Sequence, residues 1–341
     1  MGRTAAIERS FSGRALGSEL RLFVRRPSGS DAAVPSRPPA TRDGDDEAAA
    51  WACVVDEFEA VDAALSKFRD DSELTALNRL AGTDAVVEVS WRLRQAVAIM
   101  HRAGRVTDGR FDPTVLQVLE ALGEHGADLN RGCDDAPGPA IRGVTVPDGA
   151  QLERRRPVRV PARPLDTGGI GKGLALRWAA RRASALLPSG SALLLDAGGD
   201  VVAAGDRANA AWAVGIEDPV AIGVPGAEPI AVVELRAGAL ATSSVGIRRW
   251  LAPDGTGVHH IIDPATRAPA RTSLIAVTVA SDDPAWSEVW TKALFLAGRQ
   301  GIRDEARRRG LAAWWIDVDG QLGMTAAARA QTSWVDESRV R

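Results

Sequence analysis

The segment DTGGIGKGLA, residues 166–175, combines four glycines with Asp166 and Lys172. Glycines let backbone N–H groups approach a ligand closely, and a lysine at the start of a helix adds positive charge. The segment is not a Walker A loop, because Asp166 and Gly173 stand where that motif has glycine and Ser or Thr. It also lacks the GxGxxG spacing. An anionic ligand is indicated, and the alternative is a tight strand-to-helix turn with a structural aspartate.

Asp166 is unusual in such a loop, since a carboxylate repels a bare phosphate. We therefore expect Asp166 to accept a hydrogen bond from a base edge or a hydroxyl, or to lie near a cation. Two other segments carry polar chemistry. In VHHIIDPATRAPA, residues 258–270, His260 is a candidate proton acceptor near pH 7, or else a structural histidine. In ATSSVGIRRW, residues 241–250, hydroxyls that include Thr242 are followed by Arg248 and Arg249. This combination suits phosphate or ribose contacts, and the alternative is a polar boundary between a strand and a loop.

Composition narrows the class of partner. The 341 residues include 42 basic and 44 acidic side chains, so there is no basic excess for nucleic acid or an anionic membrane. No apolar stretch approaches the roughly 20 residues of a membrane span. We see no signal peptide and no lipid-attachment cysteine, and expect a cytoplasmic protein in which Cys53 and Cys133 stay reduced.

Lysine is rare in this chain. Only Lys67, Lys172 and Lys292 occur, against 39 arginines. A composition so biased to arginine suggests that each remaining lysine stands where a compact ammonium is required.

The elements that must position these residues change in kind along the chain. Helical patterns dominate early and β-branched, hairpin-linked strands dominate late, which indicates an α+β fold with a mostly antiparallel sheet flanked by helices. Ser72 and Asp112 are expected as helix caps, and Gly298 as a helix end. Strands are expected at 18–25, 156–161, 191–205, 211–219, 230–244, 273–283 and 311–325, and helices at 49–68, 91–104, 114–126, 174–188 and 285–298. A flexible insert is expected over 26–48, irregular chain over 126–155 and a tail over 330–341.

Taken in order, seven segments resemble the flavin transferase family named ApbE, the FAD:protein FMN transferases. They are FRDDSELTALN, GRFDPTV, LDTGGIGKGLA, LLLDAGGDVVAAG, ATSS, HHIIDPAT and EVWTKALFLAG. The resemblance implies one ApbE-like (T-fold-like) domain over residues 1–341, with FAD in a cleft between layers. It implies transfer of FMN from FAD to a Thr or Ser of an acceptor flavoprotein, with release of AMP.

The resemblance also assigns site residues. Asp166, His260 and Lys292 become the expected catalytic residues, with His260 removing the proton of the attacking hydroxyl. Phe68 stands where the family commonly has a tyrosine stacked on the isoalloxazine. The positions expected to bind FAD are Leu16, Phe68, Arg110, Phe111, Asp112, Asp166, Lys172, Thr242 and His260.

One departure concerns the metal. The family uses Mg²⁺ on the pyrophosphate, held by a glycine-loop carbonyl, here Gly169, and by an Asp and a Thr four residues apart on a late helix. Glu288 and Lys292 occupy the last two positions, and a protonated lysine cannot ligate Mg²⁺. Thr291 is one residue, about 100°, out of register. Either the Lys292 ammonium neutralises the pyrophosphate itself, or the chain binds FAD without transfer. A third alternative is an FAD pyrophosphatase with water as acceptor.

Overall fold

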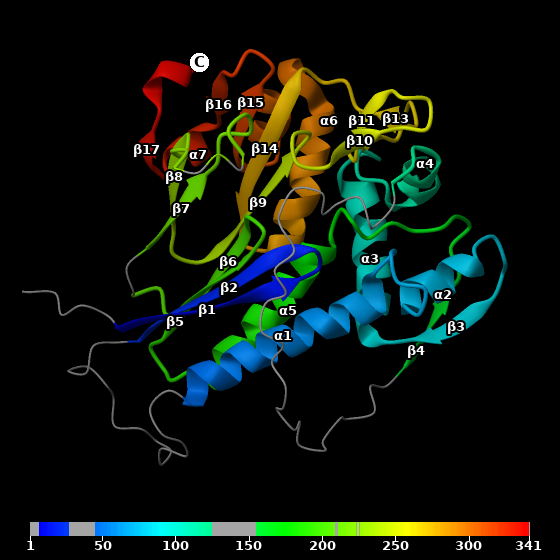
Figure 1. The fold of residues 1–341 in the computed structure, drawn as a ribbon, viewed down its shortest axis with the longest axis horizontal. Coiled ribbons are helices and arrows are strands. Elements are labelled where there is room, and N and C mark those ends of the chain that lie inside the picture. The colour runs from blue at the N-terminus through cyan, green and yellow to red at the C-terminus, as the bar shows by residue number, and fades with distance from the viewer. Residues whose placement is uncertain are drawn as a thin grey trace, which may run out of the picture.

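The computed structural model describes residues 7–26, 45–124, 155–208, 211–222, 224 and 226–340. Its largest element is an antiparallel sheet of eight strands, in the order β1–β2–β5–β6–β9–β14–β15–β16 (Figure 1). The strands are β1 (Ile7–Ala15), β2 (Ser18–Arg26), β5 (Ala192–Ala197), β6 (Asp200–Gly205), β9 (Gly238–Ser244), β14 (Leu274–Ser281), β15 (Ala312–Asp317) and β16 (Leu322–Met324). The predicted α+β class with an antiparallel sheet is confirmed.

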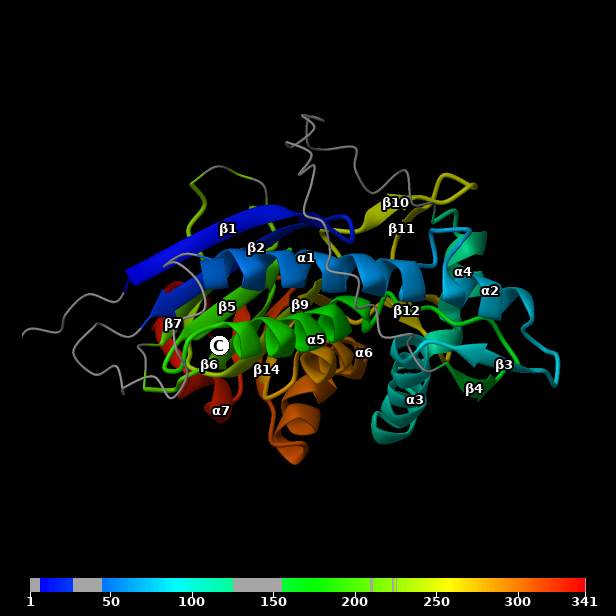
Figure 2. The same cartoon turned by 90° about the horizontal axis from the view of Figure 1, so that it is seen from below.

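Three long helices cover one face of this sheet: α1 (Asp45–Leu65), α5 (Gly171–Leu186) and α6 (Pro284–Arg308). Figure 2 shows α1 and α5 lying side by side across the sheet. Alternation in β2 explains the packing, because Leu20, Leu22 and Val24 are buried among residues of α1 and α5. This layer holds the beginnings of α5 and α6 close together.

A second, three-stranded sheet covers the opposite face. Its order is β17–β8–β7, with β7 (Trp212–Ile216), β8 (Ala231–Leu235) and β17 (Thr332–Val335). Trp212 and Trp314 lie in the apolar cluster between the two sheets. The central strand β14 is buried on both faces, since Val277 packs with the α6 cluster and Ala276 with this one. Its continuous apolar run follows from that double burial.

One of the remaining elements, the helix Trp91–Val106, has 16 residues like α5, and the others are short. The remaining elements are α2 (Glu73–Arg79), β3 (Val86–Val89), α3 (Trp91–Val106), a 3₁₀ helix (Pro113–Val115), α4 (Leu116–Ala121), β4 (Arg156–Arg159), β10 (Arg249–Leu251), β11 (Gly257–His259), β12 (Ile262–Asp263), β13 (Ala268–Pro269), α7 (Ala326–Arg329) and a 3₁₀ helix (Glu337–Arg339). Two predicted caps are confirmed: Ser72 accepts from Thr75 N at 3.0 Å, and Asp112 accepts from Thr114 N at 2.8 Å.

Several sequence expectations need correction. Residues 230–244 form two strands in different sheets, because the chain turns at Gly238 (φ 100°). The predicted tail is wrong: residues 332–335 are β17, whose register with β8 secures it in the second sheet. The helix expected to end at Gly298 is interrupted there, since that glycine has a non-helical φ of 70°, but a second helical segment that sequence reasoning missed follows to Arg308.

The boundaries near the site also shift. Helix α5 begins at Gly171 rather than at residue 174, which places Lys172 in its first turn. Of the predicted insert 26–48, Arg26 ends β2 and α1 begins at Asp45, while 27–44 lies outside the described residues. Most of 126–155, including Cys133, also lies outside them. In the part of the chain that the structure describes, no helix combines the length and apolarity needed to cross a membrane.

Candidate functional site

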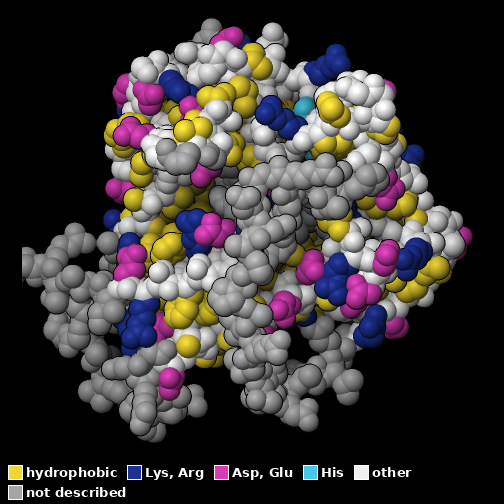
Figure 3. Space-filling view, viewed as in Figure 1, with side chains coloured by type: hydrophobic (Ala, Val, Ile, Leu, Met, Phe, Trp, Pro, Cys, Tyr) yellow, Lys and Arg dark blue, Asp and Glu magenta, His cyan; other side chains and the backbone are white. Residues whose placement is uncertain are grey.

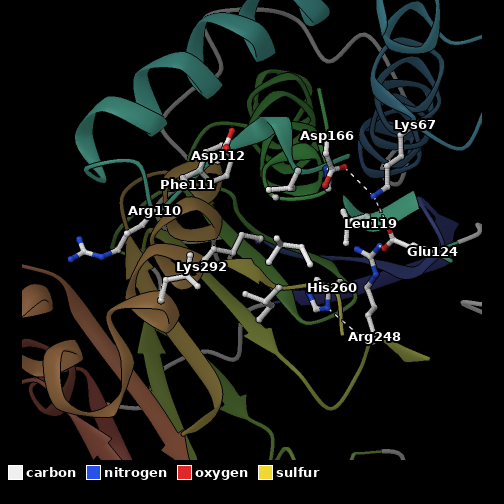
Figure 4. Close-up of a pocket in the computed structure, with 16 residues that line it drawn as sticks. Lys67, Arg110, Phe111, Asp112, Leu119, Glu124, Asp166, Arg248, His260 and Lys292 are labelled. Atoms are coloured by element: carbon white, nitrogen blue, oxygen red, sulfur yellow. Dashed lines mark hydrogen bonds and ion pairs between the residues drawn. The ribbon is translucent and has the colours of Figure 1, made fainter. Parts of the chain in front are cut away.

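A cavity of about 720 Å³ opens between the β1–β2 turn, the end of α1, the glycine loop and the first turns of α6. Its volume is in the range of sites for cofactor-sized ligands. A smaller cavity of about 50 Å³ adjoins it (Figure 4). Lys67, Gly168, Arg248, His260 and Lys292 line both. The two cavities therefore form one candidate site.

The sequence-predicted site residues come together here. Leu16, Phe68, Lys172, Thr242, His260, Glu288 and Lys292 line the larger cavity. Arg110, Phe111, Asp112, Asp166, Gly169, His260 and Lys292 line the smaller one. Arg110 differs from the others in direction, since its guanidinium points away from the cavity (Figure 4) and lies 3.7 Å from Glu305. Its side chain is thus engaged elsewhere on the protein.

Asp166 belongs to a buried row of alternating charges. Lys67 Nζ lies 3.1 Å from Asp166 Oδ1 and 2.6 Å from Glu124 Oε2, and Arg248 pairs with the other oxygen of Glu124. Figure 4 shows these four side chains converging from different elements. The Asp166 carboxylate also accepts a hydrogen bond from Gly168 N at 2.9 Å. Asp166 was expected either to accept a hydrogen bond from a ligand or to lie near a cation. The structure shows the nearby cation, which is Lys67.

The electrostatics of Asp166 follow from these partners. Burial alone would raise the pKa of its carboxyl, but Lys67, the Gly168 N–H and Arg248 outweigh burial and lower the pKa. Asp166 is therefore ionised at neutral pH, next to an ammonium that is itself buried.

The glycine loop leads directly into the N-terminus of α5, a 16-residue helix without a side-chain cap at Ile170. Lys172, in its first turn, forms an ion pair with the buried Asp200 of β6. Burial opposes the charge of Lys172, yet Asp200 and Glu288 raise the pKa of its ammonium. The helix start and the lysine both favour an anion at this end of the cavity.

Gly173 shows why the loop is rich in glycine. A Cβ at this position would lie 2.6 Å from Ala285 Cα and 2.6 Å from Pro284 O, which are backbone atoms at the start of α6. Only a residue without a side chain lets the two helix starts approach so closely. Gly173 N also donates to Glu288 Oε2 at 2.9 Å, which ties α5 to α6.

His260 lies at the junction of the two cavities. Its Nδ1 is 3.3 Å from Arg248 O, so a proton on Nδ1 leaves Nε2 as an acceptor. Burial, reinforced by Arg248 and Lys292, holds the pKa of the imidazole well below its usual value. His260 is therefore neutral at pH 7. The adjacent His259 instead contacts Ala270 O at 3.1 Å, which is a structural role.

The donor set expected for Mg²⁺ does not fit that ion. Lys292 Nζ lies 3.3 Å from Glu288 Oε1, and an ammonium has no lone pair to offer a metal. The Thr291 hydroxyl is buried and bonds Ser243 Oγ at 2.7 Å and Glu288 O at 2.7 Å. Among the described residues, no group of three His, Cys, Asp or Glu side chains is placed to hold a metal ion.

Two apolar side chains that line the large cavity are Phe68 and Leu16. Phe68 follows α1 and is 48% exposed, and Leu16 lies at the β1–β2 turn with φ 49°. A large exposed aromatic beside a cavity suits stacking on a planar ring. Over the described part of the face in Figure 3, basic and acidic side chains are interspersed rather than gathered by sign. This agrees with the balanced composition.

Sequence reasoning missed Glu124 as a residue of the site and Asp200 as the partner of Lys172. The rarity of lysine had singled out Lys67, and all three lysines of the chain line the same cavity. Arg248 is one of the two arginines expected to suit phosphate or ribose contacts, and it pairs with Glu124 and lines both cavities. Glu124 gave no such signal, since acidic residues are common throughout the chain.

Comparison with known proteins identifies the family to which this chain belongs. Residues 32–315 match the model of the ApbE family. The chain belongs to the ApbE family. Relatives of this ApbE chain include the FAD:protein FMN transferase of Treponema pallidum, 32% identical over 262 residues, which cover 69% of this chain and 67% of that protein. The FAD:protein FMN transferase of Rhodobacter capsulatus is 31% identical over 278 residues, covering 77% of this chain and 50% of that protein. The chain thus spans about half the length of the Rhodobacter relative.

Solved structures confirm the ApbE fold. The ApbE protein from Thermotoga maritima superposes with a TM-score of 0.72 at 22% identity, covering 96% of this chain and 100% of that one. The apo form of the Pseudomonas stutzeri flavinyl transferase ApbE gives 0.70 at 23% identity, covering 98% and 100%. The ApbE-like arrangement of sheet and helices expected from the sequence is therefore present.

Proposed function

We propose that this ApbE chain, acting as one domain, is an FAD:protein FMN transferase that attaches FMN to a Thr or Ser of an acceptor flavoprotein. The observation that carries the proposal is the convergence of a neutral His260, the α5 N-terminus with Lys172, and the exposed Phe68 on one cavity. Family membership and relatives that carry this name support the same activity.

The residues suit the two ends of FAD differently. Phe68 and Leu16 offer apolar contact to the isoalloxazine ring. Lys172 and the N-terminus of α5 bind the pyrophosphate, where the ammonium and the positive end of the helix dipole oppose its charge. Thr242 lines the same cavity and offers a hydroxyl to the ligand. Asp166, fixed by Lys67, supports the loop between these ends.

In the reaction, the hydroxyl oxygen of the acceptor attacks the phosphorus of the FMN half of FAD. A P–O bond to the acceptor forms, the bond to the bridging oxygen breaks, and AMP leaves with that electron pair. The hydroxyl proton passes to Nε2 of His260, whose Nδ1 proton is held by Arg248 O. Positioning and neutralisation of charge supply most of the rate in such transfers.

The experiment follows AMP and acceptor mass after incubation of the protein with FAD and a flavin-free acceptor domain. AMP together with an acceptor that has gained FMN supports the transferase. FMN and AMP released without an acceptor would identify a pyrophosphatase instead. FAD recovered intact from the protein would identify an FAD-binding protein without transfer.

A further inference from the structure

Lys292 is fixed in place by Glu288, one turn earlier on α6. Its Nζ lies 3.3 Å from Glu288 Oε1 and 3.3 Å from Glu288 O. The ammonium has three N–H donors, so these two contacts leave one donor for an oxygen of a ligand. The side chain is 16% exposed, and Lys292 lines both cavities.

The stem of Lys292 rests on the glycine loop. A Cβ built on Gly169 would lie 3.3 Å from both Cδ and Cε of Lys292, and 2.9 Å from Phe111 Cε2. The absence of a side chain at Gly169 thus makes room for the lysine. The loop that was expected to offer a carbonyl to a metal instead contacts an aliphatic chain that ends in a cation.

Glu288 connects this cation to the anion-binding end of the cavity. Its Oε2 accepts from Gly173 N at 2.9 Å, in the same turn of α5 as Lys172, while its Oε1 holds Lys292. One carboxylate therefore holds Lys292 beside the helix start where a pyrophosphate would be bound. Both oxygens of Glu288 are engaged by protein donors.

We propose that the Lys292 ammonium, held by Glu288, neutralises the pyrophosphate of FAD in place of a divalent cation, so that this chain binds FAD without Mg²⁺. The inference rests on the proposed function to the extent that FAD is the ligand of the cavity. A metal-dependent relative needs carboxylate and hydroxyl oxygens at these two positions, whereas here an ammonium supplies the charge.

The test measures the dissociation constant of FAD for the purified protein, by quenching of flavin fluorescence, in EDTA and in millimolar Mg²⁺. We expect the same affinity in both. Tightening by about tenfold or more with Mg²⁺ would overturn the inference, because a resident cation would leave little for the metal to neutralise.

Variants test whether Lys292 is the group that neutralises the pyrophosphate. Lys292→Met keeps the length of the stem and removes the charge, and we expect it to weaken FAD binding by about 10- to 100-fold, without recovery in Mg²⁺. Arg307→Met, an exposed position on the same helix, is the matched control and leaves affinity unchanged. Equal affinity of Lys292→Met and wild type would contradict the proposal.

The double variant Glu288→Asp, Lys292→Thr restores the oxygen ligands and is expected to make FAD binding depend on Mg²⁺. Should a variant fail to fold, the comparison of EDTA and Mg²⁺ on the wild type still decides. Binding in EDTA without transfer to an acceptor would leave this inference standing and refute the transferase. FAD binding that requires Mg²⁺, followed by transfer to the acceptor, would do the reverse, and no FAD binding at all would refute both.

Discussion

The Lys67 ammonium lies 3.1 Å from the Asp166 carboxylate, and both side chains are more than nine-tenths buried. This pair joins the end of α1 to the glycine loop. Glu124, 2.6 Å from Lys67 Nζ, continues the row of charges toward Arg248. Lys67 thus links the glycine loop, through Asp166, to Glu124, and Glu124 in turn pairs with Arg248.

Removal of Lys67 should destabilise the protein strongly. Lys67→Met leaves the Asp166 and Glu124 carboxylates without their shared cation, and we expect a loss of about 3–5 kcal/mol in the free energy of unfolding. Urea unfolding measures it. Arg69→Met is the matched control, since Arg69 pairs with Asp62 and Asp71 at the surface and its loss should change the free energy of unfolding little. Similar losses for the two variants would contradict the buried-pair account.

His260 should set the pH dependence of transfer. Since burial, Arg248 and Lys292 lower the pKa of its imidazole, the neutral base predominates above the ordinary value of about 6.5 and for some distance below it. The rate of transfer should therefore stay level as the pH falls from 8 to about 6.5, and decline only in more acid solution. Single-turnover rates across this range provide the measurement. A decline that begins above pH 7 would contradict a neutral, buried His260.

Replacement of the base should cost rate rather than stability. His260→Asn should slow transfer by about 10²- to 10⁴-fold while FAD remains bound. His101→Asn changes an exposed histidine of α3 and serves as the control with unchanged rate. Full activity of the His260 variant would exclude the proton-accepting role.

Substitution of Gly173 tests whether α5 and α6 need a residue without a side chain where they meet. Gly173→Ala places a methyl group 2.6 Å from backbone atoms of α6, so we expect a loss of about 1–3 kcal/mol in stability and weaker FAD binding. Gly171→Ala, in the same turn, meets only Thr167 Cβ at 4.0 Å and should be neutral or stabilising. Thermal unfolding measures the stability of both variants. Equal stability of the two would contradict the close contact expected at Gly173.

Phe68 should contribute to binding and little to folding. It is 48% exposed beside the cavity, so Phe68→Ala should leave the unfolding free energy nearly unchanged. Loss of a stacking face should weaken FAD binding by about 10- to 100-fold, whereas Phe68→Tyr should retain affinity. Fluorescence titration checks both, and undiminished affinity of the alanine variant would place the isoalloxazine elsewhere.

Elements of the fold were predictable from the sequence where the residues that determine them lie close together in the chain. Ser72 was expected to cap a helix, and the structure confirms this with a hydrogen bond from Thr75 N. The run at 230–244 misled because strand pattern alone does not report that its two halves enter different sheets. The expected tail over 330–341 was wrong because the pairing of β17 with β8 joins segments almost a hundred residues apart.

The residues of the candidate site likewise fall into those that the sequence indicated and those that it did not. Glycines, His260 and the rare lysines carried chemical signals in their types, so the sequence indicated them. The links from Lys67 to Glu124 and from Arg248 to Glu124 join residues 57 and 124 positions apart. Such partners are set by tertiary packing, and no spacing within one element predicts them.

The central claim is that FMN moves from FAD to a hydroxyl of an acceptor protein. The most direct measurement is the intact mass of a flavin-free acceptor domain after incubation with FAD and this protein, beside an acceptor whose target hydroxyl residue is replaced by alanine. We predict that the acceptor gains the mass of one bound FMN, that AMP appears in equal amount, and that the alanine acceptor stays unchanged. An acceptor of unchanged mass, with FAD recovered intact, would contradict the account.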